Sequence, residues 1–169
     1  PLSDVNLEKT SKFLVQTGDY ASFLSQKTVS GKEITEEEYN NFYMEKYYDY
    51  EAPLTTIHSN TEGSATYNAL LFVPQHASND FYTKNFEKGL QLYASGVLIM
   101  DKCGDLLPDH FAFVKGLVDS QDLSLNISRE MLQHDRQLKL MSSSLEKKIK
   151  SELLKLLKND REKKKKLCE

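Results

Sequence analysis

A long stretch near the end of the chain repeats its apolar residues at steps of three and four positions. These residues fall on one face of an α-helix: Leu138, Met141, Leu145, Ile149, Leu153 and Leu156. A helix with one apolar face has to bury that face against another layer of structure. The sequence therefore predicts a layered domain that ends in a long amphipathic helix.

The segments before this helix are expected to alternate between helices and strands. Thr35 and Glu38 form a capping box that begins an aromatic-rich helix, which Pro53 ends. We interpret its aromatic face as a packing surface rather than a platform for stacking nucleic-acid bases. Two β-rich runs, at residues 54–60 and 65–73, are separated by a loop of hairpin length that contains glycine.

Four further elements are expected between this hairpin and the long helix. They are a short helix around residues 81–88 with Gly89 as its C-cap, a buried strand at 90–100, a helix at 106–118 and a strand at 122–128. The three serines at 142–144 suggest an exposed weak point in the long helix. The order of elements predicts an α/β fold, a layered sandwich of a mixed β-sheet with flanking helices and the long C-terminal helix after it.

Composition excludes several classes of protein. The 169 residues are 39% hydrophobic and 28% charged, with only 7 Gly and 4 Pro, so collagen-like and wholly disordered chains are excluded. We find neither an uncharged apolar run of about 18 residues nor a signal-peptide pattern, and therefore expect no membrane span. Two cysteines, Cys103 and Cys168, are too few for a disulfide framework and suit the reducing cytoplasm.

Charge is unevenly distributed along the chain, whose net charge is −3. Residues 146–169 contain ten Lys or Arg against five Asp or Glu. A basic end on an acidic body is compatible with a nucleic-acid-binding tail. The alternative, which we favour, is a solvated helix face that continues into a frayed tail at residues 163–169.

Residues with metal-binding or nucleophilic chemistry are few and scattered. The four histidines, His58, His76, His110 and His134, do not pair at metal-ligand spacing, so a metal site is not expected. Cys103 has no neighbouring histidine and is interpreted as a small packing residue. The sequence contains no glycine-rich phosphate loop, so we expect no cofactor site in this chain.

The most informative segment is residues 126–133, where a predicted strand ends and a helix begins. Ser128 is placed as the N-cap, which puts Arg129 in the first helical turn, where the helix dipole disfavours a cation by about 0.3–1 kcal/mol. Arg129 is positioned to clamp a phosphate supplied by another domain, with Gln133 one turn later on the same face. The alternative is an ion pair between Arg129 and a nearby carboxylate: Glu130, Asp119 or Asp122.

Several motifs in this order carry a resemblance to a known family. They are residues 35–39, 49–53, 62–63, 89–93, 95–103, 105–111, 113–120 and 122–133, the last reading DLSLNISREMLQ. Together they resemble the middle segment of the ninety-kilodalton heat-shock chaperones, and above all of the bacterial members of that family. The similarity runs from about residue 34 to about residue 162.

The resemblance implies a function that depends on other domains. In this family an N-terminal domain binds ATP with Mg²⁺, the middle segment completes the ATPase and contacts unfolded client proteins, and a C-terminal domain dimerises the chaperone. A catalytic loop of the middle segment carries an Arg that reaches the γ-phosphate and a Gln close by; the matching positions are Arg129 and Gln133. The chain alone is then no enzyme but contributes catalytic residues to a cytoplasmic, stress-responsive chaperone.

The resemblance also sets the expected domain boundaries. Residues 33–162 form the middle domain, residues 1–32 match the family pattern poorly, and residues 163–169 are the basic tail. Partners are the ATPase and dimerisation domains and unfolded clients; no membrane is expected and nucleic acid is disfavoured. Two other functions stay open, a standalone adaptor that binds partner helices through its aromatic helix and a nucleic-acid-binding module that uses the Lys-rich end.

Overall fold

The computed structural model describes residues 34–124, 128, 130–131, 134–159, 161 and 165. Two compact units are present, Pro1–Pro53 and Leu54–Glu169, and each is described by itself. The predictions for residues 1–32, for Arg129 and Gln133, and for most of the basic tail lie outside the described residues.

The first unit contains helix α3 (Glu36–Tyr47), which begins at the predicted capping box. The Thr35 hydroxyl accepts a hydrogen bond from the Glu38 amide at 3.3 Å, and the Glu38 carboxylate accepts one from the Thr35 amide at 2.8 Å. Tyr48 ends the helix in the left-handed conformation, with φ of 52°. Phe42 and Tyr43 are buried, as expected for a packing face, whereas Tyr48 is exposed.

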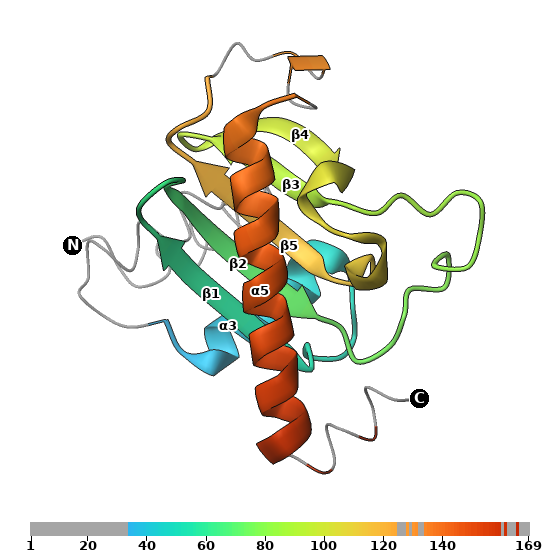
Figure 1. Cartoon of the computed structure of the whole chain (residues 1–169). Helices are drawn as coiled ribbons and strands as arrows, with labels where there is room; N and C mark the ends of the chain where they lie inside the picture. The colour runs from blue at the N-terminus through green and yellow to red at the C-terminus, as the bar shows by residue number, and fades with distance from the viewer. Residues whose placement is uncertain are drawn as a thin grey trace, which may run out of the picture. The chain divides into compact units, whose positions relative to one another are not determined.

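The second unit is built on one five-stranded mixed sheet (Figure 1). The strands are β1 (Thr55–Thr61), β2 (Tyr67–Val73), β3 (Leu90–Ala94), β4 (Val97–Cys103) and β5 (Lys115–Ser120), in the order β1-β2-β5-β3-β4. Only β3 and β5 pair in parallel; the other neighbours are antiparallel. The predicted α/β fold with a mixed sheet and the first predicted hairpin are confirmed.

Helix α5 (Arg136–Asn159) crosses one face of this sheet (Figure 1). Its buried residues are Leu138, Met141, Leu145, Ile149 and Leu156, all from the predicted apolar face. They join a core cluster with sheet residues such as Leu71, Leu92 and Val118. Truncating a leucine in such a core costs about 2–5 kcal/mol, so burial of this face is what holds the helix on the sheet.

The serine run at 142–144 does not interrupt helix α5, and of the three serines only Ser143 is exposed. The helix continues through it, and the Tyr67 hydroxyl on β2 donates a hydrogen bond of 2.7 Å to the Ser144 hydroxyl. Ser144 is half-buried and serves as a polar contact between helix and sheet. The prediction missed this role because the partner is 77 residues away in the sequence.

The single strand predicted at residues 90–100 is wrong, because the segment forms the β3–β4 hairpin. Its turn consists of Ser95 and Gly96, with φ of 48° and 82°. Two consecutive residues with positive φ are typical of the two-residue turns that match strand twist. The Ser-Gly pair was the available signal, but the apolar residues on both sides masked it.

The helix predicted at 106–118 is also wrong. Two short 3₁₀ turns, η1 (Gly104–Leu106) and η2 (Asp109–Phe111), lead directly into strand β5. A central strand is buried on both faces, so its sequence is a continuous apolar run that periodicity cannot distinguish from a buried helix.

The helix predicted around residues 81–88 and the strand predicted at 122–128 also differ from what the structure shows. Residues 81–88 form successive turns closed by bonds such as Thr83 N to Asp80 O, at 2.8 Å, instead of a helix. Gly89 is no C-cap; a Cβ on it would lie 2.8 Å from the Cys103 backbone, so it permits close strand approach. Strand β5 ends at Ser120, and residues 122–124 are not in a strand; residues 125–127 lie outside the described part.

Candidate functional site

The segment that leaves β5 and leads to α5 contains the two predicted site residues. Arg129 and Gln133 lie outside the described residues, so the structure gives no side-chain position for either. The residues that flank them are described: Leu123 on one side, Ser128 and Met131 within the segment, and His134 at its end. The hydrogen bonds of these described flanks are given below.

Three hydrogen bonds join the end of β5, the residues just after it and Thr66 of the β1–β2 loop. The Ser120 hydroxyl donates to the Thr66 carbonyl at 3.0 Å and accepts from the Asp122 amide at 3.2 Å. The Thr66 amide in turn donates to the Asp122 carboxylate at 2.7 Å. The Thr66 carbonyl is thus bound to the last residue of β5 and the Thr66 amide to the second residue after it. The bond to the Asp122 carboxylate is charge-assisted.

The same end of the sheet also includes the β3–β4 turn. The Gly96 amide donates to the Asp119 carboxylate at 3.2 Å, and the Ser95 amide donates to the Ser120 carbonyl at 3.2 Å. Leu123 follows with 5% of its surface exposed and joins the core cluster. Each of the two hairpin turns is therefore hydrogen-bonded to the end of β5 or to the residues just after it, where the predicted site segment begins.

The other end of the segment is organised by two capping residues. The Ser128 hydroxyl accepts a hydrogen bond from the Met131 amide at 3.3 Å, the geometry of an N-cap, and Glu130 and Met131 are helical. The prediction of Ser128 as N-cap is confirmed. The Asp135 carboxylate accepts from the Leu138 amide at 3.1 Å and so caps α5. The segment therefore contains a short helical piece after Ser128, and the long helix α5 starts only at Arg136.

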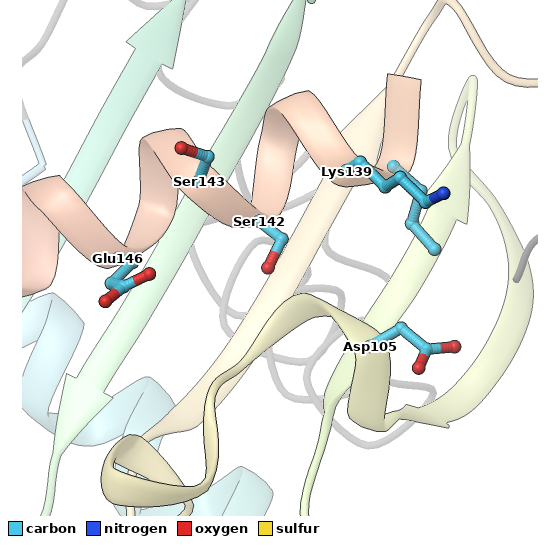
Figure 2. Close-up of a pocket in the computed structure, with 6 residues that line it drawn as sticks. Asp105, Lys139, Ser142, Ser143 and Glu146 are labelled. Carbon is cyan, nitrogen blue, oxygen red and sulfur yellow. The ribbon is translucent and has the colours of Figure 1, made fainter. Parts of the chain in front are cut away.

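A separate small cavity of about 310 Å³ lies between η1 and α5. Figure 2 shows the Ser142 hydroxyl directed toward the η1 segment and the Ser143 hydroxyl directed away from it. The lining residues carry both signs of charge: Asp105, Leu138, Lys139, Ser142, Ser143 and Glu146. Beside it, His110 lies 3.7 Å from the Glu146 carboxylate. This mixed, shallow lining does not single out one class of ligand.

The remaining candidate residues do not assemble into a further site. Among the described residues, no group of three His, Cys, Asp or Glu side chains is arranged to hold a metal ion. Cys103 is fully buried in the core cluster, which confirms its interpretation as a packing residue. Within the same described ranges, no helix is long and apolar enough to cross a membrane.

Sequence reasoning missed the residues that anchor the site segment. The sequence points to Asp122 only as an ion-pair partner of Arg129, and it gives no indication of a role for Thr66 or Tyr67. Asp122 is 56 residues from Thr66, and no local pattern indicates a contact over that separation. The only sequence signal was the placement of Ser and Asp directly after an apolar run, which is typical of a capped strand end.

Comparisons with known proteins agree with this architecture. The family model described as Hsp90 protein matches residues 12–169. The chaperone protein HtpG of Clostridium acetobutylicum is 66% identical over 130 residues, which are 77% of this chain and 21% of that protein. HtpG of Bacillus subtilis is 64% identical over 131 residues, covering 78% and 21%. The chain thus spans about a fifth of the length of these relatives.

The fold comparison points to the same part of the chaperone. The middle domain of a Plasmodium falciparum heat shock protein superposes with a TM-score of 0.67 at 25% sequence identity, over 79% of this chain and 51% of that one. A family model that covers most of the chain, relatives of high identity and a matching fold lead to one conclusion. This chain belongs to the Hsp90 family of chaperones, as a middle domain of the HtpG type.

Proposed function

We propose that this chain completes the ATPase of a full-length chaperone by supplying Arg129 to the γ-phosphate of ATP. ATP and Mg²⁺ are held by a separate N-terminal domain, and Gln133 adds a hydrogen bond to the same phosphate. The observation that carries the proposal is family membership together with the motif NISREMLQ at residues 126–133, directly after an anchored strand end.

The chemistry of phosphoryl transfer explains why an arginine is needed at this place. Negative charge is spread over the equatorial oxygens of the transferring group, and a guanidinium contacts two of them at once. A cation supplied from a second domain acts only when the two domains meet, so domain closure controls turnover. The isolated chain then neither binds nor hydrolyses ATP.

Two of the three carboxylates that the ion-pair alternative offers Arg129 already have backbone hydrogen-bond donors, and the third, Glu130, is exposed. Asp119 already accepts a hydrogen bond from the Gly96 amide, and Asp122 accepts one from the Thr66 amide. Each carboxylate therefore has a structural role that does not require an arginine. An exposed ion pair would also contribute only about 0–1 kcal/mol to stability.

The wider proposal follows the family. Two copies of the chaperone pair through a C-terminal dimerisation domain in the cytoplasm, and the middle segment makes weak contacts with unfolded client proteins. The described residues carry exposed apolar side chains that suit such contacts, among them Tyr82 and Met131.

The test is ATP turnover by the full-length chaperone that contains this chain. Arg129→Ala should lower turnover on the order of a thousandfold, since loss of such an arginine removes charge stabilisation from the transition state. Arg129→Lys should also fail substantially, because an ammonium cannot make the planar two-pronged contact. Gln133→Ala should act in the same direction but more weakly. ATP affinity should change little in all three.

Arg161→Ala is the matched control, because Arg161 is an exposed arginine beyond the end of α5, well separated in sequence from the site segment. It should leave turnover unchanged. The proposal is contradicted if Arg129→Ala keeps normal turnover per folded molecule, or if it unfolds the isolated chain while folded full-length protein remains active. The second result would make Arg129 a structural ion-pair partner.

A further inference from the structure

We propose that Tyr48 and Tyr50 form a docking surface for a basic, arginine-bearing segment of a partner protein. Both residues lie directly after α3, where their side chains are 90% and 99% exposed, more than any other large apolar side chain among the described residues. The proposal is independent of the proposed function, because neither ATP nor Arg129 takes part in it.

The turn that carries the two rings is held by hydrogen bonds of Asp49. The Asp49 amide donates to the Met44 carbonyl at 3.1 Å and so joins the turn to the end of α3. Its carboxylate accepts a bond from the hydroxyl of the buried Tyr43 at 2.8 Å and one from the Glu51 amide at 3.2 Å. Because Asp49 lies between the two exposed tyrosines, these bonds hold the backbone from which both rings project. Binding at this surface therefore costs little additional ordering of the chain.

Stability of the fold does not account for the ring of Tyr48. This residue occupies the left-handed C-cap position of α3, with φ of 52°, where glycine or asparagine is the usual residue. A tyrosine strains the backbone there, and its exposed ring gains no burial in return. Tyrosines are common on binding surfaces, because a large ring with few rotatable bonds supplies contact area at a small entropic cost. Contact with a partner would use the surface that the fold leaves open.

The charge around the rings indicates the chemistry of the partner. Residues 36–51 contain six carboxylates, at positions 36, 37, 38, 45, 49 and 51, and one cation, Lys46. Glu45 and Glu51 are exposed, and each lies within three residues of Tyr48 in the sequence. Glu45 and Tyr48 have the spacing of neighbours on a helix surface. Such a surface attracts a basic segment and repels an acidic one.

Arginine is the side chain that uses both the rings and the carboxylates. Its planar guanidinium stacks on an aromatic ring and also pairs with a carboxylate through two N–H groups, whereas a lysine ammonium is a point charge. The same helix already contains a cation above a ring, since the Lys46 ammonium lies 5.9 Å from the centroid of the Phe42 ring. We therefore expect an extended segment with several arginines to contact both exposed tyrosines.

The experiment measures binding of fluorescein-labelled peptides to the 169-residue chain by fluorescence anisotropy. The probes are peptides of repeated Gly-Arg, Gly-Lys and Gly-Glu, all of the same length. The Gly-Arg peptide should bind most tightly, the Gly-Lys peptide about twofold or more weakly, and the Gly-Glu peptide not at all. Raising the ionic strength from about 0.01 M to about 0.15 M should weaken binding, because the charges are exposed to solvent.

Variants of the two tyrosines separate docking from folding. Tyr48→Asn and Tyr50→Ser should each weaken Gly-Arg binding about two- to fivefold, the size of an exposed cation–π contact, and reduce the preference over Gly-Lys. Asparagine suits the left-handed position, so the melting temperature of Tyr48→Asn should be no lower than that of the unmodified chain. Glu45→Gln should weaken binding and make it less dependent on salt.

Glu62→Gln is the matched control, because Glu62 is an exposed carboxylate of the β1–β2 loop in the other compact unit. It should leave Gly-Arg affinity unchanged. The proposal is overturned if the Gly-Arg peptide does not bind, if Gly-Lys binds equally well, or if the folded double variant of Tyr48→Asn and Tyr50→Ser binds like the unmodified chain. An equal loss in Glu62→Gln and Glu45→Gln would also overturn it. A dimer in sedimentation velocity that the double variant loses would make a second copy the occupant, again against the proposal.

Discussion

Gly116→Ala should be one of the most destabilising single-methyl additions in the described part of this chain. Gly116 is the second residue of β5, paired with Leu71 of β2, at φ of +151°. A Cβ there would overlap the Leu70 carbonyl oxygen and lie 2.8 Å from the Leu71 Cα, and both are backbone atoms that cannot rotate away. The substitution would therefore force β2 and β5 apart.

Two contributions set the expected size of the effect. Holding a non-glycine residue at this φ costs about 1–3 kcal/mol. Forcing apart a well-packed pair of strands adds about 1–3 kcal/mol. The sum, roughly 2–6 kcal/mol, is a large part of the 5–15 kcal/mol that typically holds a domain together.

Gly63→Ala is the control that separates the two contributions. Gly63 has nearly the same φ, +144°, but a Cβ there would meet no atom within 4 Å. It should therefore lose only the conformational contribution, about 1–3 kcal/mol. Urea unfolding of the isolated chain, followed by circular dichroism, measures both variants. If Gly116→Ala is no less stable than Gly63→Ala, the close packing of β2 against β5 is wrong.

Three further predictions concern stability. Burial and a hydrogen bond to Asp49 raise the pKa of Tyr43 above its ordinary value of 10.0; the folded state thus keeps a proton that the unfolded state loses, and unfolding free energy should fall as pH rises above about 10. Tyr43→Phe should flatten that decline. If the unfolding free energies of the variant and the unmodified chain fall in parallel above about pH 10, the raised pKa of Tyr43 is contradicted. The Gln137 side-chain oxygen is buried without a hydrogen-bond partner among the described residues; Gln137→Leu should stabilise the chain by about 1 kcal/mol in urea unfolding, and a loss would show that the oxygen is satisfied. Thr35→Ala removes a capping box and should cost about 1 kcal/mol by the same measurement, whereas no change would mean that the cap contributes nothing.

Elements with local signals were predictable from the sequence. Helix α5 follows from the spacing of its apolar residues, α3 from the Thr35 and Glu38 pair, and the β1–β2 hairpin from two β-rich runs around a short loop. In each case the residues that determine the element are within a few positions of one another. The N-cap at Ser128 was predictable for the same reason.

Elements that depend on distant partners were not predictable in this way. Strand β5 lies between β2 and β3, so its apolar run is explained by neighbours about 20 to 50 residues earlier in the chain. The β3–β4 hairpin was hidden because both of its strands are apolar at the turn. The bonds of Asp122 with Thr66 and of Tyr67 with Ser144 join residues far apart in the sequence, which only the folded sheet brings together.

The most direct test of the central claim is a transplant into a relative. The 131 matching residues of Bacillus subtilis HtpG, 64% identical, are replaced by the corresponding residues of this chain, and ATP turnover is measured with and without Arg129→Ala. Our account predicts that the transplanted chaperone turns over ATP at a rate close to that of the unmodified relative, and that Arg129→Ala abolishes most of that turnover without weakening ATP binding. A folded transplant that binds ATP but does not hydrolyse it, or one whose turnover is unaffected by Arg129→Ala, would contradict it.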